Sequence, residues 1–383
     1  MAMSQRLPKA IDAMKRVYGN FEKDITALTH YDFPPNPQGH KGRYLWTDAF
    51  GVCNFVSLYR ITRDSRYLLL AERLVEVVHR ILGSTRDGKR PLPRADAQHP
   101  LRGGLRIGKL KANGIDSDGQ YYHYLVVWMF ALNRLAKVTN KTVYNDLAIE
   151  LAQVIHRKFV IHEPNLPPRI MWKMNADLTD ALVSKEGSLD AVQGYLAYML
   201  LREANRKDPN VLSKEIDDLK EIINNHPPLP NRHHKDPLDL GMGLWIAHYF
   251  ADVQGEEWAK TMKTSYVNDA DALFHLNSFD PEENPLDNRL PFREFGLAMG
   301  IACICPLVEE NRTEHDKQEN QIKQILDAWE DVILAHPKEN ANTSLIGLRR
   351  GDGDTENHID LVMYASVVCP IEFQLRDSTK QTL

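Results

Sequence analysis

The sequence is poor in cysteine and contains no long apolar run. Only four of its 383 residues are cysteines, Cys53, Cys303, Cys305 and Cys369, and they lack both the paired spacing of a zinc site and the density of a disulfide scaffold. The sequence contains no stretch of about 18 apolar residues, the length that a helix needs to span a bilayer. The charged N-terminal segment also lacks the continuous apolar core of a signal peptide. We therefore expect reduced thiols in a cytoplasmic protein that does not engage a membrane.

The chain also lacks an excess of positive charge. Its 47 Lys and Arg residues are outnumbered by 52 Asp and Glu, whereas nucleic-acid binding requires a basic surface. A phosphate-binding loop, a dinucleotide fingerprint and a serine-centred elbow are all missing. His233 and His234 are adjacent rather than four residues apart, which argues against a zinc site. We expect no nucleic-acid partner, no cofactor and no metal, and the sequence leaves the oligomeric state open.

Helical periodicity is what the sequence has in abundance. Apolar residues recur three and four positions apart in segment after segment, and alternating strand patterns are nearly missing. Some segments are charged and amphipathic, which is typical of helices at the surface. Six others are apolar nearly all round, which indicates buried helices, at residues 47–61, 117–136, 188–201, 239–251, 291–307 and 358–369. The fold class is therefore predicted to be all-α.

The two kinds of helix alternate along the chain. One amphipathic segment precedes the first apolar one and five more separate the rest, so that six outer helices pair with six inner helices. This count predicts an (α/α)6 barrel made of six helical hairpins, with residues 1–383 forming one domain and the first helix packing beside the last inner one. An open α-solenoid is the alternative.

The connections between these helices are unequal in length. Most links from an inner to an outer helix are short, whereas several links from an outer to an inner helix are long: 83–116, 161–187 and 227–237. Long ordered loops in compact domains are usually functional. We therefore expect the active face where the inner helices begin.

Each inner helix begins with an acidic residue or an acidic cluster. Such residues commonly cap helices, and we take capping as the first interpretation for any single one. Asp118 and Asp190 differ, because Ser117 or Asp116 and Ser188 are available as caps, which leaves both carboxylates for acid and base catalysis. The candidate catalytic residues are Asp190, Asp118, Asp48, Asp239 and Glu294, and further rim acids are Asp116, Glu186, Asp236, Glu356 and Asp360.

Aromatic and basic residues gather near the same helix starts. Aromatic rings stack on the faces of sugars, although they also pack in cores. Arginines and Lys109 in the loop of residues 83–116 could bind a carboxylate or phosphate, although such runs are usually solvated. The candidate substrate-binding residues are Trp46, Tyr44, Tyr121, Tyr122, Trp172, Arg102, Arg106 and His358. His123 is interpreted as a core histidine.

Two short motifs resemble those of the six-hairpin glycosidase superfamily, and most nearly those of the unsaturated glucuronyl and rhamnogalacturonyl hydrolases. They are Asp118-Gly119-Gln120-Tyr121 and Leu189-Asp190-Ala191, in which Ala191 stands where that family has Gly. The resemblance implies an (α/α)6 barrel, glycosidic bond hydrolysis, Asp190 as general acid and Asp118 as its partner.

The sequence thus predicts a carbohydrate-active enzyme, first of all a glycoside hydrolase that acts on a small and possibly anionic saccharide with paired carboxylates. Two alternatives stay open. One is an isomerase or cyclase with the same acid-lined site, which would require His or Cys partners. The other is a toroid that binds a peptide or sugar without catalysis, in which the rim acids would all be engaged as helix caps.

Overall fold

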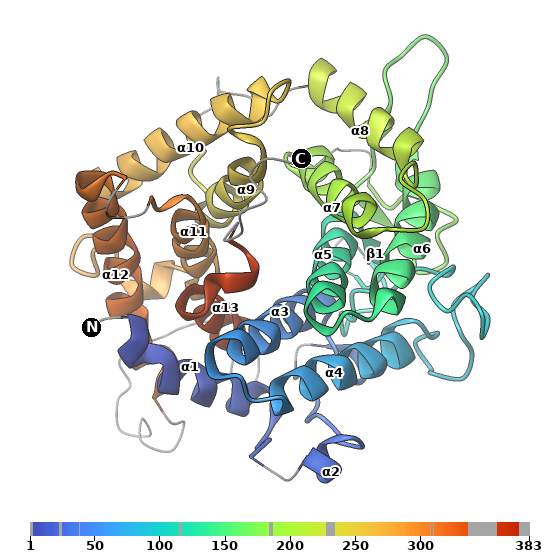
Figure 1. Ribbon diagram of the computed structural model, residues 1–383, viewed down its shortest axis with the longest axis horizontal. Helices are drawn as coiled ribbons and strands as arrows, with labels where there is room; N and C mark the ends of the chain where they lie inside the picture. Colours follow the sequence, from blue (N-terminus) through green and yellow to red (C-terminus); the bar gives the residue numbers. More distant parts are fainter. Residues whose placement is uncertain are drawn as a thin grey trace. The chain divides into compact units, whose positions relative to one another are not determined.

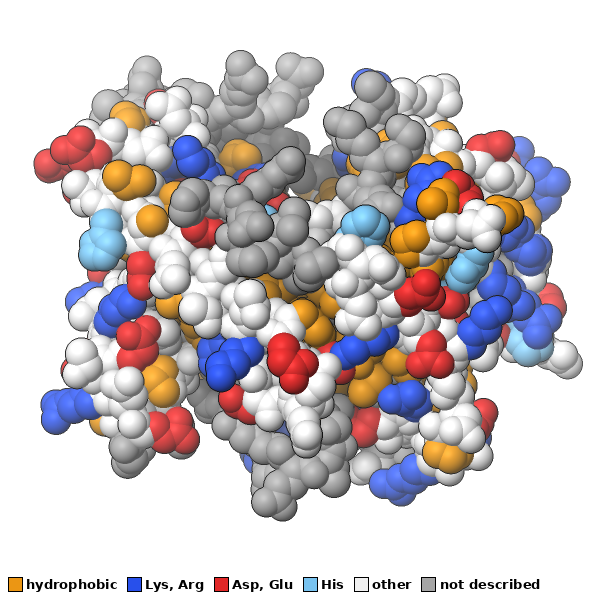
Figure 2. Space-filling model, turned by 90° about the horizontal axis from the view of Figure 1, so that it is seen from above, with side chains coloured by type: hydrophobic (Ala, Val, Ile, Leu, Met, Phe, Trp, Pro, Cys, Tyr) orange, Lys and Arg blue, Asp and Glu red, His pale blue; other side chains and the backbone are white. Residues whose placement is uncertain are grey.

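The computed structural model describes residues 3–22, 25–37, 39–114, 117–183, 187–226, 234–306, 308, 310–335 and 358–374. Helices dominate this part of the chain, and the strands are two residues long, so the predicted all-α class is confirmed. No described helix is long and apolar enough to cross a membrane. On the face shown in Figure 2, acidic and basic side chains are interspersed, as the small net charge of −5 leads one to expect.

The helices and strands are shown in Figure 1. The α-helices are α1 (Met3–Tyr18), α2 (Ile25–Leu28), α3 (Leu45–Thr62), α4 (Arg66–Leu82), α5 (Tyr122–Thr139), α6 (Thr142–Phe159), α7 (Asp190–Ala204), α8 (Ser213–Asn225), α9 (Pro237–Phe250), α10 (Glu257–His275), α11 (Pro291–Ile304), α12 (Arg312–Leu334) and α13 (His358–Val368). The strands are β1 (Gln120–Tyr121), β2 (Val160–Ile161), β3 (Arg169–Ile170) and β4 (Lys173–Met174). Short 3-10 helices cover His40–Gly42, Leu286–Asn288 and Pro370–Glu372.

The two kinds of helix alternate as predicted. The helices α3, α5, α7, α9, α11 and α13 are buried on nearly all sides, whereas α4, α8 and α12 bury one stripe of apolar residues. Several helix boundaries differ from the expected ones by a few residues. Helix α5 begins at Tyr122 rather than at Ser117, and the first amphipathic segment breaks after Tyr18, where Gly19 takes a φ of 80° that favours glycine.

The chain divides into two compact units. Residues 21–228 form one unit, in which α3, α5 and α7 are successive neighbours and α4, α6 and α8 each pack against the helix before them. Residues 1–20 and 229–383 form the other, in which α9, α11 and α13 are neighbours, with α10, α12 and α1 packed against them. The single domain predicted for residues 1–383 stays a prediction.

The N-terminal helix packs against the last inner helix, as predicted. Helix α1 contacts α13, and a buried ion pair joins Arg6 Nε to Glu330 Oε2 of α12 at 2.7 Å. The Tyr364 hydroxyl of α13 donates to the same Glu330 oxygen at 2.7 Å. Three helices that are distant in sequence are therefore joined through one carboxylate.

Helices α9 and α11 approach each other unusually closely. A Cβ atom added to Gly241 would lie 2.0 Å from the carbonyl oxygen of Gly296, and one added to Gly300 would lie 2.2 Å from the carbonyl oxygen of Gly241. Glycine costs about 1 kcal/mol relative to alanine inside a helix. This close backbone contact explains why α9 carries glycine at position 241 and α11 at position 300 despite that cost.

We predict that Gly241→Ala destabilises the protein by about 1–3 kcal/mol, the usual cost of overpacking, because the new methyl group would meet backbone atoms. Gly296→Ala is the matched control, since its methyl group would first meet Leu238 Cδ1, the end of a flexible side chain. Chemical denaturation measures both variants. Equal losses would show that the backbone approach is not the constraint.

Candidate active site

Two long loops are fixed against the start of α5. Strand β1 pairs with β4 in antiparallel register, with Gln120 opposite Met174 and Tyr121 opposite Lys173. The Tyr122 amide also donates to the Trp172 carbonyl at 2.9 Å. These bonds bring the loop between α6 and α7 to the first turn of α5, which confirms that long loops meet an inner helix where it begins.

The buried side chain of Gln120 joins these loops to each other. Its Nε2 donates to the carbonyls of Gly103 at 2.8 Å and Ala176 at 2.7 Å, and its Oε1 accepts from the Leu105 amide at 3.0 Å. Gly104 has a φ of 74°, and a Cβ atom there would overlap the Gln120 amide. One amide side chain thus holds both loops, and a glycine makes room for it.

An aromatic cluster lies at the start of α5, and we define it as Tyr44, Trp46, Tyr121, His123, Tyr124 and Trp172. Trp46 and Trp172 lie with ring centroids 6.3 and 6.2 Å from that of His123, and Tyr124 lies 4.8 Å from it. The hydroxyls of Tyr44 and Tyr124 are 2.6 Å apart. Four of the predicted substrate-binding residues, Tyr44, Trp46, Tyr121 and Trp172, are therefore gathered around one histidine.

Asp190 lies beside this histidine. It is the first residue of α7 and is buried, and its Oδ1 lies 3.6 Å from His123 Nδ1. Ser188 does not cap α7 as expected, because Leu189 is the capping residue and makes no side-chain cap bond. A Cβ atom on Gly187 would lie 2.3 Å from Asp190 Oδ2, so a larger residue there would displace the carboxylate.

The surroundings of His123 favour its neutral form. Removal from water, together with the nearby charge of Lys109, lowers the pKa of His123 from its ordinary value of 6.5. Its side chain is 32% exposed, so the imidazole can be reached by a bound molecule. At pH 7 the site therefore holds a neutral imidazole next to a carboxyl group, a pair that can exchange protons with a bound molecule.

Asp118 occupies a different setting from the one expected. It lies before α5 rather than inside it, and its Oδ2 accepts from Arg86 and Arg106, each at 2.6 Å. Its Oδ1 accepts from the Gly108 amide at 2.9 Å. Both oxygens are thus engaged within the loop, which favours a role in holding the loop.

Arg106 and Tyr122 are committed to the interior. The Arg106 guanidinium donates to Asp118 and to the carbonyls of Ser84 at 2.7 Å and Ile81 at 2.9 Å. Tyr122 is fully buried, and its hydroxyl lies 3.5 Å from that of Tyr198. Asp48 is also buried, in the first turn of α3, with Arg43 Nε 3.4 Å from its carboxylate. Arg106 and Tyr122 are thus placed as structural residues.

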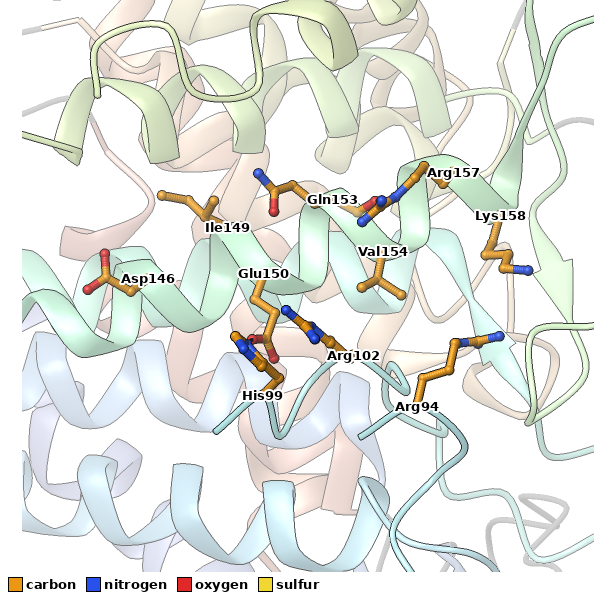
Figure 3. A pocket seen from close by; sticks show the side chains of 10 residues that line it. All are labelled: Arg94, His99, Arg102, Asp146, Ile149, Glu150, Gln153, Val154, Arg157 and Lys158. Atoms are coloured by element: carbon orange, nitrogen blue, oxygen red, sulfur yellow. Dashed lines mark hydrogen bonds and ion pairs between the residues drawn. The ribbon is translucent and has the colours of Figure 1, made fainter. Parts of the chain in front are cut away.

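Arg102 lies outside the aromatic cluster, in a pocket of about 570 Å³ formed by one loop and α6. Figure 3 shows His99 and Arg102 of the loop beside Glu150 of α6. His99 Nδ1 lies 2.8 Å from Glu150 Oε2, which fixes the loop to the helix. This position separates Arg102 from Asp190 and His123.

The remaining predicted residues belong to the other unit. Glu294 accepts two bonds from Arg289, at 2.7 and 2.6 Å, and one from Trp329 at 2.8 Å, so its carboxylate is engaged. Burial, and next the charge of Asp236, raise the pKa of Asp239. His358 is the buried first residue of α13. Of these three residues, Asp239 is the one whose surroundings favour the protonated carboxyl group that a proton donor needs.

Further rim acids act locally or fall outside the described residues. Asp236 caps α9 by accepting from the amides of Leu238 and Asp239, and Asp360 accepts from the Phe292 amide at 2.9 Å. Asp116, Glu186, His233 and Glu356 lie outside the described part of the chain.

The four cysteines are free thiols, and burial raises the pKa of Cys305 to about 11 and that of Cys369 to about 12, which disfavours the reactive thiolate.

Sequence reasoning did not select His123 or Tyr124 for this site. His123 was interpreted as a core residue because it lies in an apolar segment. A better signal is the run Tyr121-Tyr122-His123-Tyr124, which places a polar ring among aromatic ones directly after a long loop. Lys109 lies in that loop with its Nζ 5.5 Å from the centroid of Tyr121.

We predict that Asp118→Asn destabilises the protein by roughly 3–5 kcal/mol, because it leaves two arginines without their buried counter-ion. Asp96→Asn is the control, since Asp96 lies in the same loop, is exposed and accepts from backbone amides. Thermal and chemical unfolding measure both. Unchanged stability with lost turnover would instead restore Asp118 to the catalytic role that its motif implies.

The comparisons with known proteins give structural likeness alone. No protein-family model matches the chain, and no curated protein matches it in sequence. An α-1,6-mannanase of glycoside hydrolase family 76 from Salegentibacter is 12% identical and superposes over 97% of this chain and 100% of its own, with a TM-score of 0.57. A sugar epimerase from a ruminal bacterium (12% identity, 94% and 98% coverage, TM-score 0.51) and cellobiose 2-epimerase from Spirochaeta thermophila (13%, 85% and 86%, 0.51) are also similar. The chain therefore has the fold of the six-hairpin, (α/α)6-barrel enzymes.

Proposed function

We propose that this protein is a carbohydrate-active enzyme whose proton-transfer pair is Asp190 and His123. The observation that carries the proposal is the carboxyl group of Asp190 lying 3.6 Å from His123 within the aromatic cluster. Aromatic faces bind the apolar faces of sugars, and a carboxyl group with a neutral imidazole supplies both an acid and a base.

The first reaction that we propose is hydrolysis of a glycosidic bond. In its protonated form Asp190 gives a proton to the glycosidic oxygen, whose bond to the anomeric carbon breaks. Water then adds to that carbon and releases a proton to solvent, and the products are two sugars. His123, 3.6 Å from Asp190, returns a proton from solvent to the Asp190 carboxylate through its imidazole, since a pair this close leaves no room between its members for the sugar and the attacking water. This scheme keeps the acid role expected for Asp190 and gives it an imidazole as partner, because the oxygens of Asp118 are held by two arginines.

The mannanase likeness does not extend to its aspartates. One similar structure is an inactive variant in which two consecutive aspartates are replaced, in complex with α-1,6-mannotriose. The only consecutive aspartates in this chain are Asp217 and Asp218, which lie on the amphipathic helix α8. Whatever sugar this protein acts on, we therefore expect its acid and base to differ from that pair.

A sugar isomerase or epimerase is the second candidate, and His123 favours it. That alternative requires a histidine or cysteine partner for the acids, and a neutral imidazole can remove a proton from carbon or oxygen. Two of the similar structures are epimerases by name. In an isomerisation or epimerisation the product has the same mass as the substrate.

An anionic substrate is supported by Lys109. Its ammonium group adds to the effect of burial in lowering the pKa of His123, and it lies near the ring of Tyr121. Lys109 therefore places a positive charge at the aromatic cluster. Arg102 and Arg106 were the expected anion-binding residues, but Arg106 is buried against Asp118 and Arg102 lies over α6. We propose that Lys109 takes their place.

Product analysis distinguishes these reactions. The protein is incubated in D2O with neutral and uronic-acid di- and trisaccharides, including α-1,6-mannotriose and cellobiose, and the products are analysed by mass spectrometry and NMR. New reducing ends indicate hydrolysis, whereas an isomer of unchanged connectivity, with deuterium on the carbon that exchanged its proton with solvent, indicates isomerisation or epimerisation. Binding without turnover of any of these saccharides would favour a non-catalytic toroid.

We predict that Asp190→Asn and His123→Gln each lower turnover by about 10²- to 10⁴-fold, the usual effect of losing a general acid or base, while the helical fold is kept. Asp146→Asn is the control, because Asp146 is a surface residue paired with Lys207. Activity and circular dichroism are measured together. Full activity of both site variants would refute this pair and redirect attention to Asp48 and Asp239.

We also predict that Lys109→Met raises KM for an anionic saccharide at least about tenfold, as expected for the loss of a charge-assisted contact of about 1.4 kcal/mol or more. KM for the neutral saccharide of the same size should change little. Steady-state kinetics with the matched substrate pair tests this, and an equal change for both substrates would argue against charge recognition by Lys109.

A further inference from the structure

A second group of polar side chains lies at the end of α6, away from the aromatic cluster in sequence. His156 is in the last turn of α6, His162 directly follows β2, and Asp218 is on α8. His156 is buried, Asp218 is partly buried, and His162 is 54% exposed. Three separate elements thus bring two imidazoles and a carboxylate to one place.

The ligating atoms of these residues converge. His156 Nε2 lies 3.0 Å and His162 Nε2 3.3 Å from the same oxygen, Asp218 Oδ2, and all three atoms lie within 4.8 Å of one another. Donor atoms bound tetrahedrally to one zinc ion are about 3.4 Å apart, given metal–ligand distances near 2.1 Å. The observed spacing therefore fits three ligands of a single ion with little rearrangement.

The surroundings leave room for a further ligand. These residues line a pocket of about 440 Å³, together with Glu215, which lies one turn before Asp218 on the same face of α8. Zinc sites with three protein ligands complete their shell with water or another group. Two imidazoles and a carboxylate suit Zn²⁺ better than the hard cations Mg²⁺ and Ca²⁺, which prefer oxygen.

We propose that His156, His162 and Asp218 form a binding site for a divalent transition-metal ion, with Zn²⁺ as the best match. The ion joins the end of α6 and strand β2 to α8, and it does so independently of the proton-transfer pair proposed above. This proposal differs from the expectation of no metal, which was drawn from the adjacent His233 and His234 and not from these three residues. The site has three protein ligands and a position open to the pocket.

The test uses the full chain without an affinity tag. Isothermal titration with Zn²⁺ should give one ion per chain in the wild type, and addition of Zn²⁺ should raise the melting temperature. Titration with Co²⁺ should give the intense visible absorption of a tetrahedral site. Loss of an outer-sphere partner costs about 10- to 100-fold in metal affinity. His162→Ala and Asp218→Asn each remove a proposed ligand, so each should weaken Zn²⁺ binding by more than this.

His99→Ala is the matched control, because His99 also pairs with a carboxylate on α6, that of Glu150, but has no second imidazole there. This variant should bind Zn²⁺ like the wild type. His162 is exposed, so its replacement should leave the fold intact, which circular dichroism checks. Absence of stoichiometric binding to the wild type, or equal binding by His162→Ala and the wild type, would overturn the proposal.

Discussion

The buried contact of Asp118 with Arg86 and Arg106 is the interaction on which the candidate site depends. It joins the end of α4 to the segment before α5, since Arg106 also donates to carbonyls at the C-terminus of α4, where the helix dipole favours a cation. Strand β1 begins two residues after Asp118 and pairs with β4, which brings Trp172 to the first turn of α5. The buried carboxylate of Asp118 therefore fixes the loop on which the aromatic cluster forms.

The acidic residues at the helix starts fall into two groups, according to whether their carboxylate oxygens are bonded within the protein. Asp118 and Glu294 each have both oxygens bonded to arginines, amides or an indole, and Asp236 caps a helix. A carboxylate whose oxygens are engaged in this way has no oxygen left for a substrate, and removing one of its partners destabilises the protein. Asp190 instead faces an imidazole, and burial makes Asp239 harder to ionise.

The fold could be predicted from the sequence because each apolar segment carries its own period, and α7, α9, α11 and α13 begin within two residues of the expected positions. The partners of Asp118 could not, because Arg86 and Arg106 lie 32 and 12 residues away in a loop without periodicity. For the same reason Arg106 was expected to bind substrate when it binds its own chain. His123 was missed because a histidine in an apolar helix is usually part of the core, and only tertiary contacts with Trp46, Trp172 and Asp190 distinguish it.

Charge in the loop before α5 connects these observations to the proposed chemistry. Two arginines face one carboxylate, and Lys109 adds a further positive charge, so this loop is electropositive where it meets the aromatic cluster. Burial, and next the charge of Lys109, lower the pKa of His123, which keeps its imidazole neutral near pH 7. The same positive charge attracts anions, so an anionic saccharide would be drawn to the side of the aromatic cluster where Lys109 lies. The loop that holds Asp118 would thus set both the protonation of the imidazole and the orientation of the substrate beside it.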